Sequence, residues 1–276
     1  MTRVLTLCAD DFGMSAGVSR SIARLAASHR LSAISCLANA KQWRVNAPLL
    51  ADLTTSIQVG LHFNLTEGEP CSGELKRVWP RLPALPKLIA LAHLRALPRA
   101  ALAAEFAAQW AAFSDIRGAE PAFVDGHQHV HHLPLVRDVV LAALDNERTA
   151  VRNTGRVLGP GFAVKRALIA GTGGRALQRA LARRGIAHNA ALLGVYDFDS
   201  TDYRALMQQW LAALPSEGAL LFCHPGDADA SVPDAIASAR VREADYLASA
   251  AFSDDLAAAN VTLGAAWRVS ETSTRD

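Results

Sequence analysis

Short apolar segments of strand length alternate along this chain with segments whose apolar residues recur at helical spacing. Candidate strands cover 4–9, 32–38, 56–66, a run from 122, 150–153, 190–195, 219–223 and 261–269. Helical stripes separate most of them, the first running through Val18, Ile22 and Leu25 behind Ser15, a good helix cap. About seven or eight such alternations predict an α/β fold with a parallel sheet, most simply a distorted (β/α) barrel.

The length of the chain fits one barrel-sized unit. A chain of 276 residues can bury a full core, so we expect a single domain over 1–276. The stretch 68–98 differs from the rest because it holds five of the 12 prolines. There we expect an irregular insertion that serves as a lid or binding loop over the active site.

Two adjacent carboxylates, Asp10 and Asp11, directly follow the first candidate strand. Active sites of α/β folds lie at the carboxyl ends of strands. Neighbouring side chains of an extended strand point to opposite faces, so the two carboxylates would play different parts around one centre. The alternative is that one of them caps the following helix while the other is solvated.

Histidines also stand in or directly after the candidate strands. His62 stands on the polar parity of the third candidate strand, and His224 ends the strand 219–223 before a proline and a glycine. Four more histidines fall within six positions after the run from 122: His127, His129, His131 and His132. If that strand stays extended, the first three share one face, which is typical of a metal site or of catalysis. The alternative is a set of hydrogen-bonded histidines in a polar core.

Composition excludes several classes of protein. A formal net charge of +2 gives no basic footprint, so we expect no nucleic-acid partner. No apolar stretch approaches the roughly 20 residues of a membrane span, and no signal-peptide pattern precedes the acidic pair. Four cysteines without CxxC spacing are predicted to be buried thiols: Cys8, Cys36, Cys71 and Cys223. We therefore expect a reduced, cytoplasmic protein, with the oligomeric state left open and a homo-oligomer among the alternatives.

The stretch 148–196 contains no acidic residue, although it holds nine basic ones: Arg148, Arg152, Arg156, Lys165, Arg166, Arg175, Arg179, Arg183 and Arg184. Leucines accompany the later charges at helical spacing, which predicts a basic amphipathic helix. Such helices suit anionic surfaces, including the surface of a membrane. The alternative is an ordinary solvated helix face.

Gathered at one barrel mouth, these side chains form a hydrolytic set. One aspartate and two histidines can hold a divalent metal and leave positions open for water and substrate. A second carboxylate can act as general base, and a further histidine as general acid. The set therefore predicts hydrolysis of an amide or an ester. Two imidazoles with one carboxylate favour zinc or another transition metal.

Four motifs also carry a family resemblance. They are Ala9-Asp10-Asp11-Phe12-Gly13, Gly60-Leu61-His62-Phe63-Asn64-Leu65-Thr66, Asp125-Gly126-His127-Gln128-His129-Val130-His131 and Cys223-His224-Pro225. In this order they resemble the YdjC-like carbohydrate deacetylases, the relatives of chitooligosaccharide deacetylase and of the hopanoid-biosynthesis deacetylase. The resemblance implies a distorted β/α barrel that removes acetyl groups from N-acetylated amino sugars with a divalent metal, Mg²⁺ or Zn²⁺.

The resemblance also implies roles for individual residues. Asp11, His62 and His127 match metal ligands, Asp10 matches the general base, and His224 matches the general acid. Arg152, His129 and His131 are expected to contact the substrate. Gly126 and Gln128 stand where some relatives have serine and histidine, which leaves the first histidine of that motif intact.

Two other functions fit parts of the pattern. A metal-dependent phosphoesterase would also use paired aspartates and histidines, but we see no additional acidic cluster for a second metal. A catalytically silent sugar- or lipid-binding protein of the same fold would not need the intact acidic and histidine set. The basic stretch suggests that the N-acetyl sugar is carried on an anionic or lipid-linked acceptor.

Overall fold

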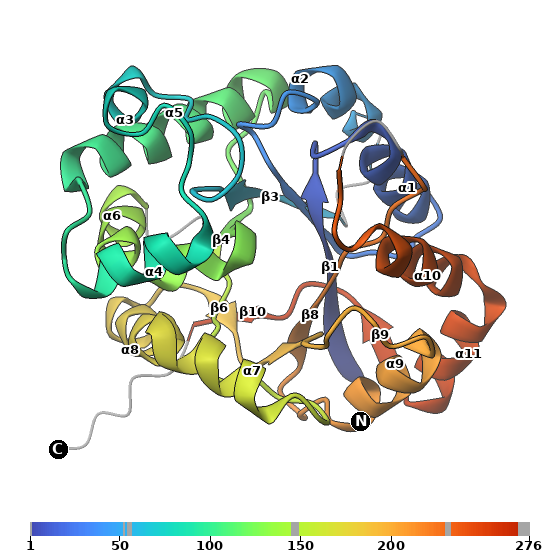
Figure 1. Ribbon diagram of the computed structural model, residues 1–276. Coiled ribbons are helices and arrows are strands. Elements are labelled where there is room, and N and C mark those ends of the chain that lie inside the picture. Colours follow the sequence, from blue (N-terminus) through green and yellow to red (C-terminus); the bar gives the residue numbers. More distant parts are fainter. Residues whose placement is uncertain (1, 52, 54–56, 145–148, 230–232, 270–276) are drawn as a thin grey trace, which may run out of the picture.

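The strands form one curled sheet at the centre of the molecule, and helices surround it (Figure 1). The computed structural model describes residues 2–51, 53, 57–144, 149–229 and 233–269. Within them the strands are β1 Arg3–Phe12, β2 Ala33–Cys36, β3 Gln58–Phe63, β4 Phe123–Gly126, β5 Ala150–Val151, β6 His188–Asn189, β7 Leu192–Leu193, β8 Ala219–Cys223, β9 Val261–Leu263 and β10 Trp267–Arg268.

The order of the strands confirms the predicted α/β distorted barrel. The path runs β10-β6-β5-β4-β3-β2-β1-β8-β7, and β9 pairs with β1. The pairs along it are parallel except for β10 with β6, which is antiparallel. The path has two ends, so the barrel is incompletely closed. An isolated parallel bridge from Val157 to Leu192 adds a contact to the terminal strand β7.

β1 lies in the middle of the sheet. Its apolar residues are buried from Leu5 onward, as expected for a strand covered on both faces. The strand is longer than the predicted 4–9, because it continues through the acidic pair to Phe12. Its register aligns Ala9 with Ile34 of β2 and with Cys223 of β8. The polar residues that end β1, β3, β4 and β8 consequently meet at one end of the barrel.

Helices and helical turns cover the sheet. They are α1 Ala16–Ala27, α2 Trp43–Asn46, η1 Ala47–Leu50, α3 Gly73–Val78, α4 Leu85–His93, α5 Arg99–Arg117, η2 His127–His132, α6 Val136–Ala143, α7 Ala163–Ile169, η3 Ala170–Gly174, α8 Arg175–Arg184, α9 Tyr203–Ala212, α10 Ala237–Ala248 and α11 Ala250–Ala258. In α1 the predicted stripe of Val18, Ile22 and Leu25 is buried, and the Val18 amide donates to the capping Ser15 Oγ at 3.2 Å.

Several predicted boundaries were wrong. The stretch 68–98 is irregular only in part, since α3 and α4 lie within it. The Leu75 amide donates to the capping Ser72 Oγ, and Pro86 lies in the first turn of α4, where a missing N–H is harmless. The stretch between β8 and the last candidate strand contains two consecutive helices, because Ser249 is extended between α10 and α11. The last predicted strand is likewise two strands, β9 and β10, and 190–195 is paired only at β7 among the described residues.

The cysteines and the basic stretch also differ from expectation in part. Cys8, Cys36 and Cys223 are buried as predicted, but Cys71 is exposed. Arg148 lies outside the described residues. The basic helix is present as α8, which buries Leu177 and Leu181. No helix in the described part of the chain is both long and apolar enough to cross a membrane.

Candidate active site

The acidic pair lies at the carboxyl end of β1, and both side chains are buried. The helix-cap alternative is wrong, because Ser15 caps α1 and neither carboxylate is solvated. Asp11 has a φ of 69°, and the register of β1 against β2 shifts between Ala9 and Phe12. A non-glycine residue with positive φ is uncommon and marks a position held by its surroundings.

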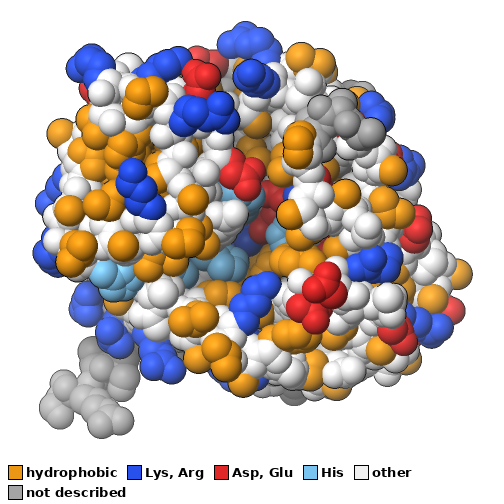
Figure 2. All heavy atoms as spheres, in the orientation of Figure 1, with side chains coloured by type: hydrophobic (Ala, Val, Ile, Leu, Met, Phe, Trp, Pro, Cys, Tyr) orange, Lys and Arg blue, Asp and Glu red, His pale blue; other side chains and the backbone are white. Residues whose placement is uncertain are grey.

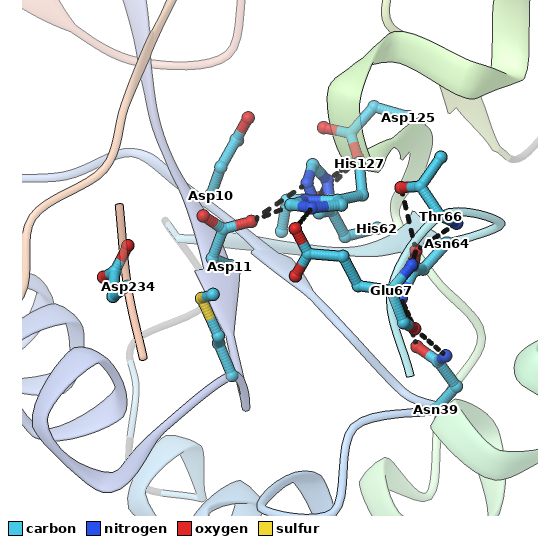
Figure 3. Close-up of polar contacts among 12 residues, drawn as sticks. Asp10, Asp11, Asn39, His62, Asn64, Thr66, Glu67, Asp125, His127 and Asp234 are labelled. Carbon is cyan, nitrogen blue, oxygen red and sulfur yellow. Dashed lines mark hydrogen bonds and ion pairs between the residues drawn. The ribbon is translucent and has the colours of Figure 1, made fainter. Parts of the chain in front are cut away.

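Asp11 lies between two histidines (Figure 3). Its Oδ1 is 3.0 Å from His127 Nδ1 and 3.4 Å from His62 Nε2. One ligand atom from each of these three residues lies within 4.8 Å of the others. The second oxygen of Asp11 accepts a hydrogen bond from Arg240 Nη2 at 2.8 Å, and Arg240 Nε donates to Asp234 at 2.6 Å.

The far nitrogen of each imidazole meets another carboxylate. β3 and β4 pair His62 with Asp125 in register, and His62 Nδ1 lies 2.6 Å from Asp125 Oδ1. Ser35 on β2 donates to the same oxygen at 2.5 Å. His127 Nε2 lies 3.1 Å from Oε1 of Glu67. An imidazole whose far nitrogen faces a carboxylate is a common arrangement in metal centres. The three inward-facing atoms therefore fit a divalent metal ion by donor type and by orientation.

Charge coupling shifts the pKa values of this group. Burial lowers the pKa of His62, but Asp125 and Asp10 outweigh it and raise the pKa to about 10. Burial also lowers the pKa of His127, and Asp11 outweighs it, so that this pKa is about 9. Burial raises the pKa of Asp11, while Arg240 and His127 hold it well below its usual range. Without a metal, both imidazoles are therefore protonated at pH 7.

The carboxylate of Asp10 lies against Arg152, which follows β5. Both oxygens of Asp10 accept hydrogen bonds from the guanidinium, at 2.7 and 2.6 Å. Arg152 also pairs with Asp125 and donates to Cys8 Sγ at 3.2 Å. The side chain of Arg152 is 0% exposed. It therefore supports two carboxylates of the site and offers no exposed atom to a substrate.

The histidine-rich stretch is not extended, although the expectation of three histidines on one strand face depended on extended geometry. β4 ends at Gly126, and Gln128 and His129 have φ values of 52° and 61°. The chain turns there, so His127, His129 and His131 do not share one strand face. His131 Nε2 bonds to the carbonyl of Arg152 at 2.9 Å.

His132 and His129 take different surroundings in the same turn. His132 lies between the hydroxyls of Thr154 and Thr172, at 2.9 and 3.1 Å, which fits the polar-core alternative. The ring of His129 packs against Phe222 at 5.3 Å between centroids.

His224 follows β8 beside β1. The pairing of Ala9 with Cys223 places the next residues, Asp10 and His224, next to each other. The ring of His224 packs edge-on against Phe222 and Phe198, and its buried Nδ1 has no hydrogen-bond partner. Burial lowers the pKa of His224 to about 4, against the opposing influence of the nearby carboxylates.

The space-filling view shows how the site opens. Acidic and histidine side chains are visible together in a hollow near the centre of the face drawn in Figure 2, with hydrophobic side chains around it. A ligand that enters this hollow meets the carboxyl ends of the strands.

Comparison with known proteins fits this arrangement of fold and motifs. A family model described as YdjC-like protein matches residues 4–258. The chain belongs to the YdjC-like family. This finding confirms the resemblance carried by the four motifs.

Two curated proteins illustrate the similarity of this YdjC-like chain. The chitooligosaccharide deacetylase of Klebsiella pneumoniae is 32% identical over 161 residues, which cover 55% of this chain and 60% of that protein. The protein of the same name from Salmonella typhimurium is 32% identical over 147 residues, 51% of this chain and 55% of that protein. The matched region therefore spans a little more than half the length of these relatives.

One solved structure shares the fold of the YdjC-like chain. It is an Enterococcus faecalis protein described as a candidate cellobiose-phosphate cleavage protein, with a TM-score of 0.73 and 18% identity. The alignment covers 96% of this chain and 98% of that one. At this identity the likeness concerns the fold alone.

Sequence reasoning missed several residues of this YdjC-like site. Asp125 belongs to a motif we singled out, and the period-2 pattern of β3 and β4 could have paired it with His62. Glu67 directly follows the second motif, but nothing local points its side chain at His127. Arg240 lies on α10 and carries no sequence signal for the site. The same is true of Glu243 on that helix, which accepts a hydrogen bond from the His224 amide.

Proposed function

We propose that this chain is a metal-dependent hydrolase that removes an acetyl group from an N-acetylated amino sugar. The observation that carries the proposal is the buried group of Asp11, His62 and His127, with ligand atoms within 4.8 Å of one another. Asp10 and His224 lie beside this group. Membership of the YdjC-like family and the names of the two curated relatives support an acetylated carbohydrate as substrate.

In this proposal Asp11, His62 and His127 hold the metal, Mg²⁺ or Zn²⁺. A divalent ion there would activate a water molecule and polarise the acetyl carbonyl. Asp10 accepts the proton of the attacking water, since Arg152 fixes its carboxylate beside the site. The water oxygen bonds to the acetyl carbon, the C–N bond breaks, and acetate and a free amine are the products.

His224 donates the proton that the departing amine nitrogen needs. In the structure the ring is neutral at pH 7, because burial lowers its pKa to about 4. It must therefore take up a proton before it acts as an acid, and the negative charges of Asp10 and Asp11 favour that uptake. The hydrophobic contacts with Phe198 and Phe222 keep the ring in place.

The structure offers little support for a two-metal phosphoesterase. Among the described residues, a second group with metal-ligand spacing consists of Cys8, Asp10 and Asp125. The guanidinium of Arg152 already neutralises this group. The positive charge of the guanidinium opposes the binding of a second metal ion there.

For the acceptor of the sugar, we propose an anionic or lipid-linked group. Arg175, Arg179 and Arg183 are exposed and recur every four residues on α8, while Leu177 and Leu181 are buried. This geometry presents the basic face to solvent, where it can meet a phosphate or an anionic membrane surface. Replacing the three arginines with glutamine should weaken binding to anionic vesicles. The control variant has Arg20, Arg44 and Arg77 replaced with glutamine. Equal vesicle binding by the two variants would contradict the proposal of an anionic or lipid-linked acceptor.

Acetate release tests the main proposal. Metal-stripped protein would receive Mg²⁺, Zn²⁺, Mn²⁺ or Co²⁺ singly, with soluble and lipid-linked N-acetylglucosamine substrates. We expect acetate release that requires metal and is lost in His127→Ala. Phosphate release from sugar phosphates, without acetate release from any substrate, would instead favour the phosphoesterase.

A further inference from the structure

Glu67 lies at the mouth of the proposed metal site and reaches one of its histidines. The residue belongs to the loop between β3 and α3. Its Oε1 is 3.1 Å from Nε2 of His127, although the ring N–H does not point squarely at the oxygen. Figure 3 shows the Glu67 side chain directed from this loop toward the histidine pair. Glu67 itself is not part of the tight group of three ligand atoms.

The two histidines have matching surroundings. Each has one nitrogen toward Asp11, at 3.4 Å for His62 Nε2 and 3.0 Å for His127 Nδ1. Each has its other nitrogen against a carboxylate, Asp125 at 2.6 Å or Glu67 at 3.1 Å. A neutral imidazole carries its proton on one nitrogen only. A carboxylate that accepts that proton leaves the lone pair on the nitrogen that faces Asp11.

The backbone of Glu67 is anchored, which gives the side chain a fixed origin. Asn64 accepts hydrogen bonds from the amides of Thr66 and Glu67, at 2.9 and 3.1 Å, and donates to the Glu67 carbonyl at 2.8 Å. Gln109 in turn holds the backbone of Asn64 on both sides, at 3.0 and 2.7 Å. The loop is therefore tied to α5 at the point where Glu67 leaves it.

We propose that Glu67 is a positioning residue for the metal centre. Its carboxylate accepts the Nε2 proton of His127 and so keeps Nδ1 available to the metal. This inference rests on the metal site of the proposed function. Asp125 does the same for His62 from a fully buried position, whereas the side chain of Glu67 is 46% exposed. The support of His127 is consequently the part of the centre that lies open to an arriving substrate.

Zinc affinity tests the proposal without an activity assay. Titration calorimetry, with a competing chelator where binding is tight, would compare the wild-type chain with Glu67→Ala and Glu67→Gln. We expect Glu67→Ala to weaken Zn²⁺ binding by about 10- to 100-fold, the usual effect of removing a carboxylate that supports a ligand. Glu67→Gln keeps an acceptor oxygen and should recover most of the affinity. If Glu67→Ala binds zinc as tightly as the wild type, the proposal is wrong.

Glu69→Ala is the matched control. Glu69 is in the same loop, but its carboxylate pairs with Lys76 at 2.7 Å instead of with the site. Glu69→Ala removes one negative charge, as Glu67→Ala does, and it should leave zinc affinity unchanged. An equal loss of zinc affinity in both variants would show that any nearby negative charge has the same effect as Glu67. That result would overturn the proposal. Failure of the wild-type chain to bind zinc or magnesium would instead remove the metal site on which the proposed function depends.

The tautomer of His127 gives a second readout. Long-range ¹H–¹⁵N correlation spectra of the zinc-loaded protein should show His127 protonated at Nε2 and metal-bound through Nδ1. The opposite assignment in the wild-type protein would contradict the proposal, whatever the affinities are. In Glu67→Ala we expect the His127 signals to broaden or shift while those of His62 stay in place.

Discussion

Arg152 holds both carboxylate oxygens of Asp10, at 2.6 and 2.7 Å, across a sequence separation of 142 residues. A guanidinium fork that meets a carboxylate with two parallel hydrogen bonds fixes its orientation as well as its charge. Asp10 therefore enters the reaction as an oriented carboxylate, while the neighbouring Asp11 faces the proposed metal.

Replacement of Asp10 by Asn separates the acceptance of a proton from the binding of the metal. The amide cannot accept the proton of an attacking water, so we expect acetate release to fall by about 10²- to 10⁴-fold, the usual contribution of a general base. Metal content should stay near that of the wild type, because Asp11, His62 and His127 are unchanged. Full activity in this variant would exclude Asp10 as the base, and a loss of metal would assign it to the ligand set.

His224→Ala should discriminate between leaving groups. An amine needs a proton as it departs, whereas a 4-nitrophenolate does not. We therefore expect about a 10²- to 10⁴-fold loss with N-acetyl sugars and a much smaller loss with 4-nitrophenyl acetate. The two substrates can be compared on one enzyme preparation. Equal losses with both would show that His224 acts by shaping the site and not as an acid.

Metal binding should release protons at neutral pH. The pKa values of His62 and His127 are about 10 and about 9 in the metal-free protein, so both rings are charged at pH 7. A metal ligand must be neutral, and affinity therefore rises with pH until these groups have titrated. Calorimetry of Zn²⁺ binding in buffers of different ionisation enthalpy should detect the release of up to two protons. A heat independent of the buffer would contradict the prediction.

Glu243 predicts a dependence of stability on pH. It lies beneath the site, where it accepts hydrogen bonds from the Tyr196 hydroxyl and, at 2.5 Å, from the His224 amide. Burial raises its pKa to about 7, although these hydrogen bonds act in the opposite direction. A carboxyl whose pKa is raised in the folded state binds its proton more tightly there than in the unfolded chain. The ionised form therefore destabilises the folded state as the pH rises from about 4.5 to 7.

The variant Glu243→Gln isolates this effect. The free energy of unfolding of the variant minus that of the wild type should increase from pH 4.5 to pH 8, by up to about 3 kcal/mol. Urea unfolding at both pH values measures the change, and the titration of other groups largely cancels in the difference. A constant difference between the two proteins would show that Glu243 has an ordinary pKa.

The sequence allowed the general architecture to be predicted because two of its signals are local. Strand-length apolar runs alternate with helical stripes, and the polar residues stand where the runs end. In a parallel sheet these ends share one edge, which accounts for the meeting of residues from β1, β3, β4 and β8. The YdjC-like motifs mark the same positions. Roles within the site remain proposals.

Other features depend on contacts that no local pattern encodes. The turn after Gly126 is one case, since extended geometry would place three histidines on one face. A Cβ atom at Gly126 would lie 2.8 Å from the His131 amide nitrogen, so this close return of the chain requires glycine. The burial of Arg152 is another, because an arginine within a basic stretch gives no sign of the two carboxylates that surround it.

The position of β1 in the sheet has a consequence for the order of assembly. This strand carries Asp10 and Asp11, yet it pairs with β8 and β9 from the last quarter of the chain. At typical synthesis rates of about 5 to 20 residues per second, β8 follows β1 from the ribosome by roughly 10 to 40 s. Throughout that interval one edge of β1 has no partner strand, and Arg240 has not yet reached Asp11. The surroundings of Asp11 are therefore completed only after α10 has been synthesised, although the three proposed metal ligands all lie earlier in the chain.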